Sequence, residues 1–178
     1  MPAEEELLAI RCQLGERDAF DALIARWHEP VWSYARRVAG SADAADDVVQ
    51  DVWMRVMRGL PRLKDPSRLR AWIFGIARRA LMDRFRQQYA APLMSDVDVA
   101  DLGAPDAGQD WADDLVQMHE QLAALPVVER DVLALFYLQE LSMSEVSEVL
   151  AVPVGTIKSR PYRARRMLHA RITEGSSR

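Results

Sequence analysis

Apolar residues recur at helical spacing along most of the chain, and no segment shows the alternation of a half-buried strand. The spacing predicts helices over 4–14, 17–39, 43–58, 67–88, 113–124, 126–138, 142–150 and 154–172. Turn chemistry at Gly15, Gly40-Ser41 and Gly59-Leu60-Pro61 separates the first four, and Pro30 is expected to bend or break the second. The chain is therefore predicted to be all-α.

Residues 90–112 interrupt the periodicity. They contain two prolines and two glycines, and the overlapping stretch 91–118 carries seven aspartates and no base, a local charge of −7. Such composition is typical of a flexible linker. We therefore expect two small helical domains, 1–89 and 113–178, joined by an acidic linker over 90–112.

Positive charge is concentrated in two segments, although the whole chain has a net charge of −4. Residues 62–86 hold eight Lys or Arg against two acids, and residues 155–173 hold six with no acid, so each has a local charge of +6. Two basic segments suggest two contacts with phosphate groups. Solvated helix faces are the alternative for either segment alone.

The first residues, the lack of a long apolar stretch and the single cysteine narrow the class of protein further. The start, "MPAEEELLAI", lacks the basic and apolar regions of a secretory signal. No stretch approaches the roughly 20 apolar residues that span a bilayer. Cys12 is alone, which excludes an internal disulfide and a cysteine-rich zinc site, and it is more readily explained as a packed residue than as a redox group. We expect a cytoplasmic protein without membrane insertion.

The helix within 42–58 has one apolar and one acidic face. Val48, Val49, Val52 and Val56 share the arc expected to face a core. The opposite arc holds Asp43, Asp46, Asp47, Gln50 and Asp51. Acids in the first turns also suit the helix dipole, which explains the first two without any partner. The dipole explains less well why this polar face continues beside Met54, and a protein-docking surface is the competing interpretation.

The helix within 68–88 repeats the pattern with the opposite charge. Its apolar face comprises Leu69, Trp72, Ile73, Ile76 and Ala80. Its other face comprises Arg78, Arg79, Met82 and Arg86, a candidate contact for a phosphate backbone. Trp72 and Phe74 could stack on bases. At this spacing a core role is the better interpretation for Trp72, and the role of Phe74 stays open.

"LSMSEVSEVLAVPVGTIKSR" has the pattern of a helix-turn-helix. Ser142 and Glu145 form a capping box, and Pro153 suits the start of the second helix. On that helix the buried face is predicted to comprise Ile157, Pro161, Ala164, Leu168 and Ile172. The exposed face and its flank comprise Thr156, Lys158, Ser159, Tyr162, Arg163, Arg166 and His169. In this motif the second helix enters the major groove, so these side chains are candidates for base and phosphate contacts.

Five segments in this order resemble a bacterial extracytoplasmic-function (group IV) sigma factor of RNA polymerase. They are "FDALIARWHEPVWSYARRVAG", "DAADDVVQDVWMRVMR", "RLRAWIFGIARRALMDRFRQQ", "LAALPVVERDVLALFYLQELSMSEVSEVL" and "PVGTIKSR". The resemblance implies a non-enzymatic protein without metal or cofactor. It implies core RNA polymerase, promoter DNA and an anti-sigma factor as partners.

The resemblance also implies residue roles. Core polymerase would dock on Asp46, Asp47, Gln50 and Asp51. The −10 element would be opened by the loop 60–67 and gripped by Lys64, Arg78, Arg79 and Arg86, at a cost of a few kcal/mol for each extruded base. The −35 element would be read by Thr156, Lys158, Ser159, Arg160, Tyr162, Arg163 and Arg166. The acidic linker would thread toward the polymerase active site.

Two positions depart from the family's pattern. Ala151 stands where glycine is usual, which implies strain if the backbone there is left-handed. Pro161 stands where leucine is usual, and it removes the amide that would bond to the carbonyl of Ile157. An interior proline costs about 3 kcal/mol in a helix. We therefore expect the recognition helix to kink near Ile157–Pro161 or to restart at Pro161.

Two other classes of protein explain less of the sequence. An enzyme is disfavoured because His28, His119 and His169 are scattered and no phosphate-binding glycine loop is present. A stand-alone helix-turn-helix repressor would explain residues 126–172, but it leaves the helices of residues 17–88 without a role. Such a repressor binds its operator unaided, whereas a sigma factor needs polymerase.

Overall fold

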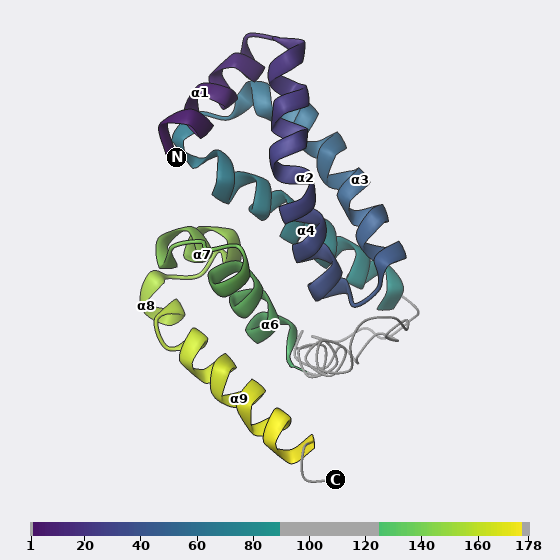
Figure 1. The fold of residues 1–178 in the computed structure, drawn as a ribbon, viewed down its shortest axis with the longest axis vertical. Helices are drawn as coiled ribbons and strands as arrows, with labels where there is room; N and C mark the ends of the chain where they lie inside the picture. Colours follow the sequence, from purple (N-terminus) through teal and green to yellow (C-terminus); the bar gives the residue numbers. More distant parts are fainter. Residues whose placement is uncertain (1, 90–124, 176–178) are drawn as a thin grey trace.

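The computed structural model describes residues 2–89 and 125–175, and all the regular structure in them is helical (Figure 1). The predicted linker 90–112 and the predicted helix 113–124 lie outside these residues. The first half forms a bundle of α1 (Pro2–Gln13), α2 (Arg17–Ala39), α3 (Ala42–Gly59) and α4 (Leu69–Tyr89). Two short 3-10 turns, η1 (Leu60–Arg62) and η2 (Pro66–Arg68), connect α3 to α4. The predicted all-α class is confirmed.

The predicted turns in the first half occur where expected. Gly15 and Gly40 both adopt a positive φ, of 82° and 85°, which only glycine tolerates without strain. Ser41 then caps α3, since its hydroxyl accepts from the amide of Ala44 at 3.3 Å. At the far end of α3 a Cβ on Gly59 would lie 2.9 Å from Cζ2 of Trp72. The glycine therefore allows α4 to approach the end of α3 closely.

Pro30 neither breaks nor ends α2, so the stronger form of that prediction is wrong. The helix is continuous from Arg17 to Ala39 with the proline inside it. Beyond the proline, Val31, Tyr34, Ala35 and Val38 are fully buried. Burial of large apolar side chains contributes about 1.5–3 kcal/mol each, which offsets the hydrogen bond that proline removes.

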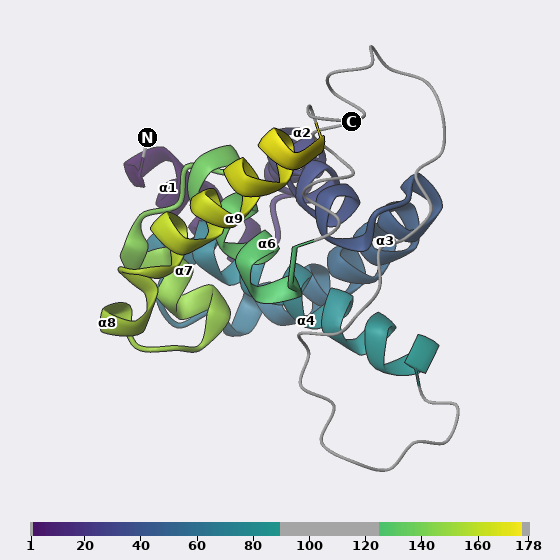
Figure 2. The same ribbon diagram turned by 90° about the horizontal axis from the view of Figure 1, so that it is seen from below.

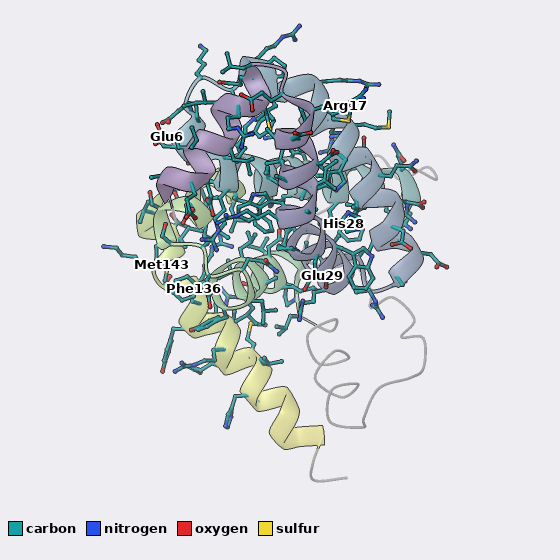
Figure 3. All side chains as sticks on the ribbon, turned by 45° about the horizontal axis from the view of Figure 1, so that its top comes forward. Glu6, Arg17, His28, Glu29, Phe136 and Met143 are labelled. Carbon is teal, nitrogen blue, oxygen red and sulfur yellow. The ribbon has the colours of Figure 1, made fainter. Side chains whose placement is uncertain are left out.

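The second half contains α6 (Val127–Leu133), a π-helical turn η4 (Ala134–Leu138), α7 (Met143–Leu150), α8 (Val154–Ile157) and α9 (Arg160–Gly175). Figure 2 shows α6 and α7 lying across α4, and Figure 1 shows α9 extending away from the first bundle. Phe136 and Met143 pack on the side that faces the N-terminal helices (Figure 3). None of the described helices is long and apolar enough to cross a membrane.

One hydrophobic core runs through both halves. It joins Val31 and Phe74 of the first half to Val132, Leu135 and Val146 of the second. The two helical domains are therefore packed against each other in this structure. A smaller cluster of Leu125, Leu133 and Ala164 fixes α9 to α6.

Candidate binding surfaces

The acidic face of α3 points away from the core, as its periodicity predicts. Val48, Val49, Val52 and Val56 are buried on the opposite side. Asp46, Asp47 and Gln50 are exposed, and Asp51 is partly so. Asp46 accepts a hydrogen bond from Nε1 of Trp32 at 2.7 Å, which ties it to α2. Three carboxylates and an amide thus form one polar surface.

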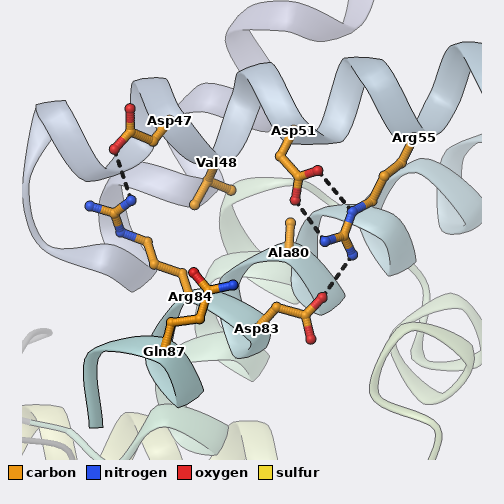
Figure 4. A pocket seen from close by; sticks show the side chains of 8 residues that line it. All are labelled: Asp47, Val48, Asp51, Arg55, Ala80, Asp83, Arg84 and Gln87. Carbon is orange, nitrogen blue, oxygen red and sulfur yellow. Dashed lines mark hydrogen bonds and ion pairs between the residues drawn. The ribbon is translucent and has the colours of Figure 1, made fainter. Parts of the chain in front are cut away.

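An open cleft of about 340 Å³ lies between α3 and α4 (Figure 4). On one side of it Nη1 of Arg84 lies 2.8 Å from Oδ2 of Asp47. On the other side Arg55 bridges Asp51 at 2.7 Å and Asp83 at 2.9 Å. These two carboxylates raise the pKa of the Arg55 guanidinium. The acidic face of α3 is therefore partly neutralised by arginines of the same protein.

The predicted −10 residues lie in two different environments. Lys64, Arg79 and Arg86 are exposed, the last beside Asp83 at 3.4 Å. Arg78 is only 22% exposed, and its Nε lies 3.1 Å from Oδ2 of Asp131 on α6. The arginine face of α4 thus has an open part and a part covered by the second half.

The aromatic residues of α4 belong to the packing more than to the surface. Phe74 is fully buried, edge-on to Trp27 at 6.1 Å and to Tyr34 at 5.6 Å between ring centroids. Trp72 is partly buried against Gly59. The suggestion that Phe74 could stack on bases is wrong, because its ring is closed off on all sides by the core.

Asp131 is the fully buried carboxylate of α6. Its Oδ1 accepts from the Tyr34 hydroxyl at 2.8 Å, and its Oδ2 pairs with Arg78. Burial raises the pKa of the Asp131 carboxyl, and burial together with the Asp131 charge raises the pKa of Tyr34. Next to it, buried Arg130 donates to the carbonyls of Val38 at 2.8 Å and Leu125 at 3.0 Å.

Sequence reasoning missed this site, although a signal for it exists. Asp131 lies four residues after Val127 and four before Leu135, so it sits in the middle of an apolar helical face. An acid at such a position needs a partner, because an unpaired buried charge is very costly. The sequence pattern does not reveal that the partners lie on α2 and α4.

The helix-turn-helix forms as predicted. Ser142 and Glu145 make both hydrogen bonds of the capping box, at 2.8 and 3.2 Å. Val146, Val149 and Leu150 are buried. Ala151 has φ 55° and ψ 40°, so the left-handed conformation suspected at this non-glycine position is present. Pro153 immediately precedes α8.

The second helix of the motif is divided, as Pro161 predicts. It ends as α8 at Ile157 and restarts as α9 at Arg160, one residue before the proline. Pro161 itself is buried, as are Ile157 and Ala164 of the same predicted inner face. Lys158 keeps a right-handed helical backbone. The interruption is therefore a local loss of hydrogen bonds and not a wide turn.

The predicted −35 residues lie mainly on the outer surface of this divided helix. Thr156, Lys158, Ser159, Tyr162, Arg163 and Arg166 are exposed, and Arg160 is partly buried. Arg163 is 70% exposed and lies 3.8 Å from Glu129. The exposed surface of α8 and α9 is thus rich in positive charge and hydroxyl groups.

Two family models match the chain. One is Sigma-70 region 2, over residues 23–90, and the other is Sigma-70, region 4, over residues 115–168. The first covers most of the half that a stand-alone repressor would leave unexplained.

Individual relatives agree with these matches. The chain is 31% identical to the ECF RNA polymerase sigma factor SigM of Mycobacterium tuberculosis, over 93% of this chain and 83% of that protein. It is 27% identical to the ECF sigma-E factor of Escherichia coli, over 94% of each.

Solved structures show the same fold. CnrH, in complex with the cytosolic domain of CnrY, superposes with a TM-score of 0.73 and 26% identity over 96% of this chain and 97% of that one. RpoE of Bartonella quintana, in complex with the anti-sigma factor NepR, shares the fold with a TM-score of 0.70, covering 86% of this chain and 96% of that one, at 23% identity. The chain therefore belongs to the extracytoplasmic-function sigma factors of the sigma-70 family, which direct RNA polymerase to promoters.

Proposed function

We propose that the three surfaces described above divide the work of a sigma factor: α3 docks core polymerase, residues 60–89 open the −10 element, and the divided helix α8–α9 reads the −35 element. The observation that carries the proposal is the separation of charge. The exposed face of α3 is acidic, whereas the exposed parts of α4 and α9 are basic. A single chain thus offers one surface to a basic protein and two to nucleic acid.

The docking face of α3 ends in an exposed apolar side chain. Met54 follows Asp47, Gln50 and Asp51 at helical spacing and is 46% exposed. Methionine is enriched in protein interfaces, so an exposed Met54 beside these polar groups fits a docking surface. The complementary surface of polymerase would therefore have an apolar groove rimmed by arginine or lysine.

The −10 surface combines an exposed loop with a basic helix. Lys64 lies between η1 and η2, and Arg79 and Arg86 lie on the outer side of α4. A displaced single strand would be held by backbone contacts to these cations. Arg78 would join them once its contact with Asp131 is broken.

The −35 surface has the composition of a duplex reader. Arg163 and Arg166 suit phosphates or guanine edges, while Thr156, Lys158 and Ser159 lie at the start of the motif's second helix, where base edges are met. Because Pro161 divides the helix, Thr156 lies in α8, Lys158 and Ser159 lie between the two segments, and both arginines lie in α9. Their relative orientation would set how many of them reach one groove.

We further propose that the protein acts without catalysis of its own and resides in the cytoplasm with polymerase. Its −10 and −35 surfaces recognise and open DNA, and the bond-forming chemistry belongs to polymerase. A cognate anti-sigma factor is the expected regulator, since RpoE of Bartonella quintana, which shares the fold, is described in complex with the anti-sigma factor NepR.

The deciding experiment is run-off transcription with purified core polymerase on a library of promoter sequences. The wild-type chain should select a family of −10 and −35 sequences, and the chain without polymerase should bind the same DNA weakly. A double variant, Asp47→Arg with Asp51→Arg, should lose polymerase binding while its helical circular dichroism is kept. Unchanged affinity of that variant would remove the docking role from α3.

A further inference from the structure

The contact between the two halves is built from buried polar groups as well as apolar ones. Tyr34 of α2 and Asp131 of α6 are both fully buried, and Arg78 of α4 closes the site from the third side. The three side chains come from three helices, two in the first half and one in the second. Separation of the halves breaks both contacts of the carboxylate at once.

Further polar contacts surround this centre. Arg130 reaches across to the carbonyl of Val38, and Arg70 donates to the carbonyl of Gln139. At the rim Arg68 lies 3.5 Å from Glu148, with both side chains more than a third exposed. The rim pair contributes little because it is solvated, whereas the buried contacts are specific to this arrangement.

The packed arrangement is incompatible with binding both promoter elements. Elements named −10 and −35 are about 25 base pairs apart, or roughly 85 Å of duplex at 3.4 Å per base pair. Helices that share one hydrophobic core cannot reach both sites. The 90–124 segment could span up to roughly 115 Å if fully extended, so the chain is long enough to let the halves separate.

The same arrangement also keeps Arg78, a candidate DNA-binding residue, paired within the protein. Arg78 faces Asp131, while Arg79 on the same helix is exposed. A carboxylate occupies the place that a phosphate oxygen would take on this guanidinium. We propose that the free chain is held closed by the Tyr34–Asp131–Arg78 contact, and that separation of the halves releases Arg78 to the DNA strand. The release of Arg78 to DNA rests on the −10 role proposed above.

The closed form is tested by the distance between the halves in the full chain. Nitroxide labels at two exposed positions, Arg58→Cys on α3 and Ser144→Cys on α7, report on it in a Cys12→Ala background by pulsed electron resonance. The free chain should give one short distance, and saturating core polymerase should lengthen it.

Two variants break the contact from opposite sides. Asp131→Ala leaves the Tyr34 hydroxyl without its acceptor, and Tyr34→Phe removes one donor from the carboxylate. Each should raise the open-to-closed ratio, by about tenfold for Asp131→Ala, since a buried polar group loses its partner. Glu148→Gln is the matched control at the rim and should leave the distance unchanged. If Asp131→Ala loses its helical circular dichroism, the distance in Tyr34→Phe decides whether the contact holds the chain closed.

Binding of a single-stranded −10 oligonucleotide completes the test. It should strengthen about tenfold in Asp131→Ala, in parallel with the distance change. The proposal that the Tyr34–Asp131–Arg78 contact holds the chain closed would be overturned by either of two results. The free chain could already be open, or the variants could leave the distance unchanged. If the distance lengthens without any gain in oligonucleotide binding, the contact does hold the chain closed, but the release of Arg78 to DNA is rejected. Loss of run-off transcription in all forms, wild type included, would instead reject the proposed function.

Discussion

The guanidinium of Arg84 on α4 lies 2.8 Å from the carboxylate of Asp47 on α3, across the cleft between the two helices (Figure 4). The carboxylate is 66% exposed, so one side of it still faces solvent. A basic partner that approaches α3 must therefore compete with an internal cation. Docking strength is set by both helices, although the acidic residues lie on one.

Removal of that internal cation is expected to strengthen docking. Arg84→Gln leaves Asp47 free for a partner's arginine or lysine. Because exposed ion pairs are worth about 0.2–1 kcal/mol, affinity for core polymerase should rise by no more than about fivefold. Titration of labelled chain with core polymerase measures it. Arg86→Gln, on the same helix but 76% exposed, is the control and should change little. Weaker binding of Arg84→Gln would show that Arg84 itself contacts polymerase.

Pro161→Leu is expected to join α8 and α9 into one helix. The leucine amide can donate to the carbonyl of Ile157, and the Lys158 backbone is already helical. The gain in free energy of unfolding should be about 1–3 kcal/mol, seen as a higher Tm, with tighter binding to −35 duplex. Pro153→Leu, at the start of α8, is the matched control. No gain in either quantity would show that the divided helix tolerates the ring.

Arg163 and Arg166 should govern the salt dependence of −35 binding. Each phosphate contact that is lost lowers the slope of log affinity against log salt by about 0.9. Arg163→Gln with Arg166→Gln should therefore flatten the slope by up to about 1.8. Titrations of a −35 duplex at several salt concentrations measure the slope. An unchanged slope would show that this face of α9 does not contact the DNA.

Acid pH is expected to favour the closed form. Burial raises the pKa of Asp131 above the ordinary 3.8 in that form, even though Arg78, Tyr34 and Arg130 act in the opposite direction. The closed form therefore binds the proton more tightly than the open one. This stabilisation is complete below 3.8 and is lost as pH rises through the raised pKa.

The label distance measures this pH effect. Distances recorded between pH about 7 and about 4.5 should show the closed share growing as pH falls. Asp131→Asn, which cannot titrate but keeps an acceptor, should stay closed and lose that response. If the wild type and Asp131→Asn respond equally to pH, the pH effect belongs to other carboxylates.

Cys12 should react slowly with alkylating reagents in the folded chain. The side chain is 2% exposed, and burial raises the pKa of its thiol above 9.0. Since the thiolate is the reactive form, the alkylation rate at neutral pH should be low and should still rise beyond pH 9. Mass spectrometry of iodoacetamide-treated protein, native and denatured, provides the comparison. Rapid native labelling would reopen the redox role.

The helices and caps could be predicted because they depend on neighbours in sequence. The valine face of α3, the capping box at Ser142 and Glu145, and the division near Pro161 all follow from spacing and backbone chemistry. Pro30 shows the limit of such rules, since burial beyond it carries α2 through the proline.

Long-range partners could not be predicted, because periodicity tells that a face is covered but not by what. Phe74 and Trp72 are five and three residues from Leu69. The ring of Phe74 is enclosed by Trp27 and Tyr34, whereas Trp72 packs beside Gly59. Asp131 is the clearest case. Its neighbours in sequence are apolar or basic, and its partners lie more than fifty residues away.

The Arg78–Asp131 pair also has a consequence for how promoters are discriminated. A carboxylate tethered to its guanidinium acts as a competitor at an effective concentration that is on the order of millimolar for flexibly linked sites. DNA that offers only one phosphate does not displace this carboxylate from the guanidinium. Only a site that engages both halves together gains enough to displace the tethered group, so the chain's own aspartate would filter out non-specific DNA.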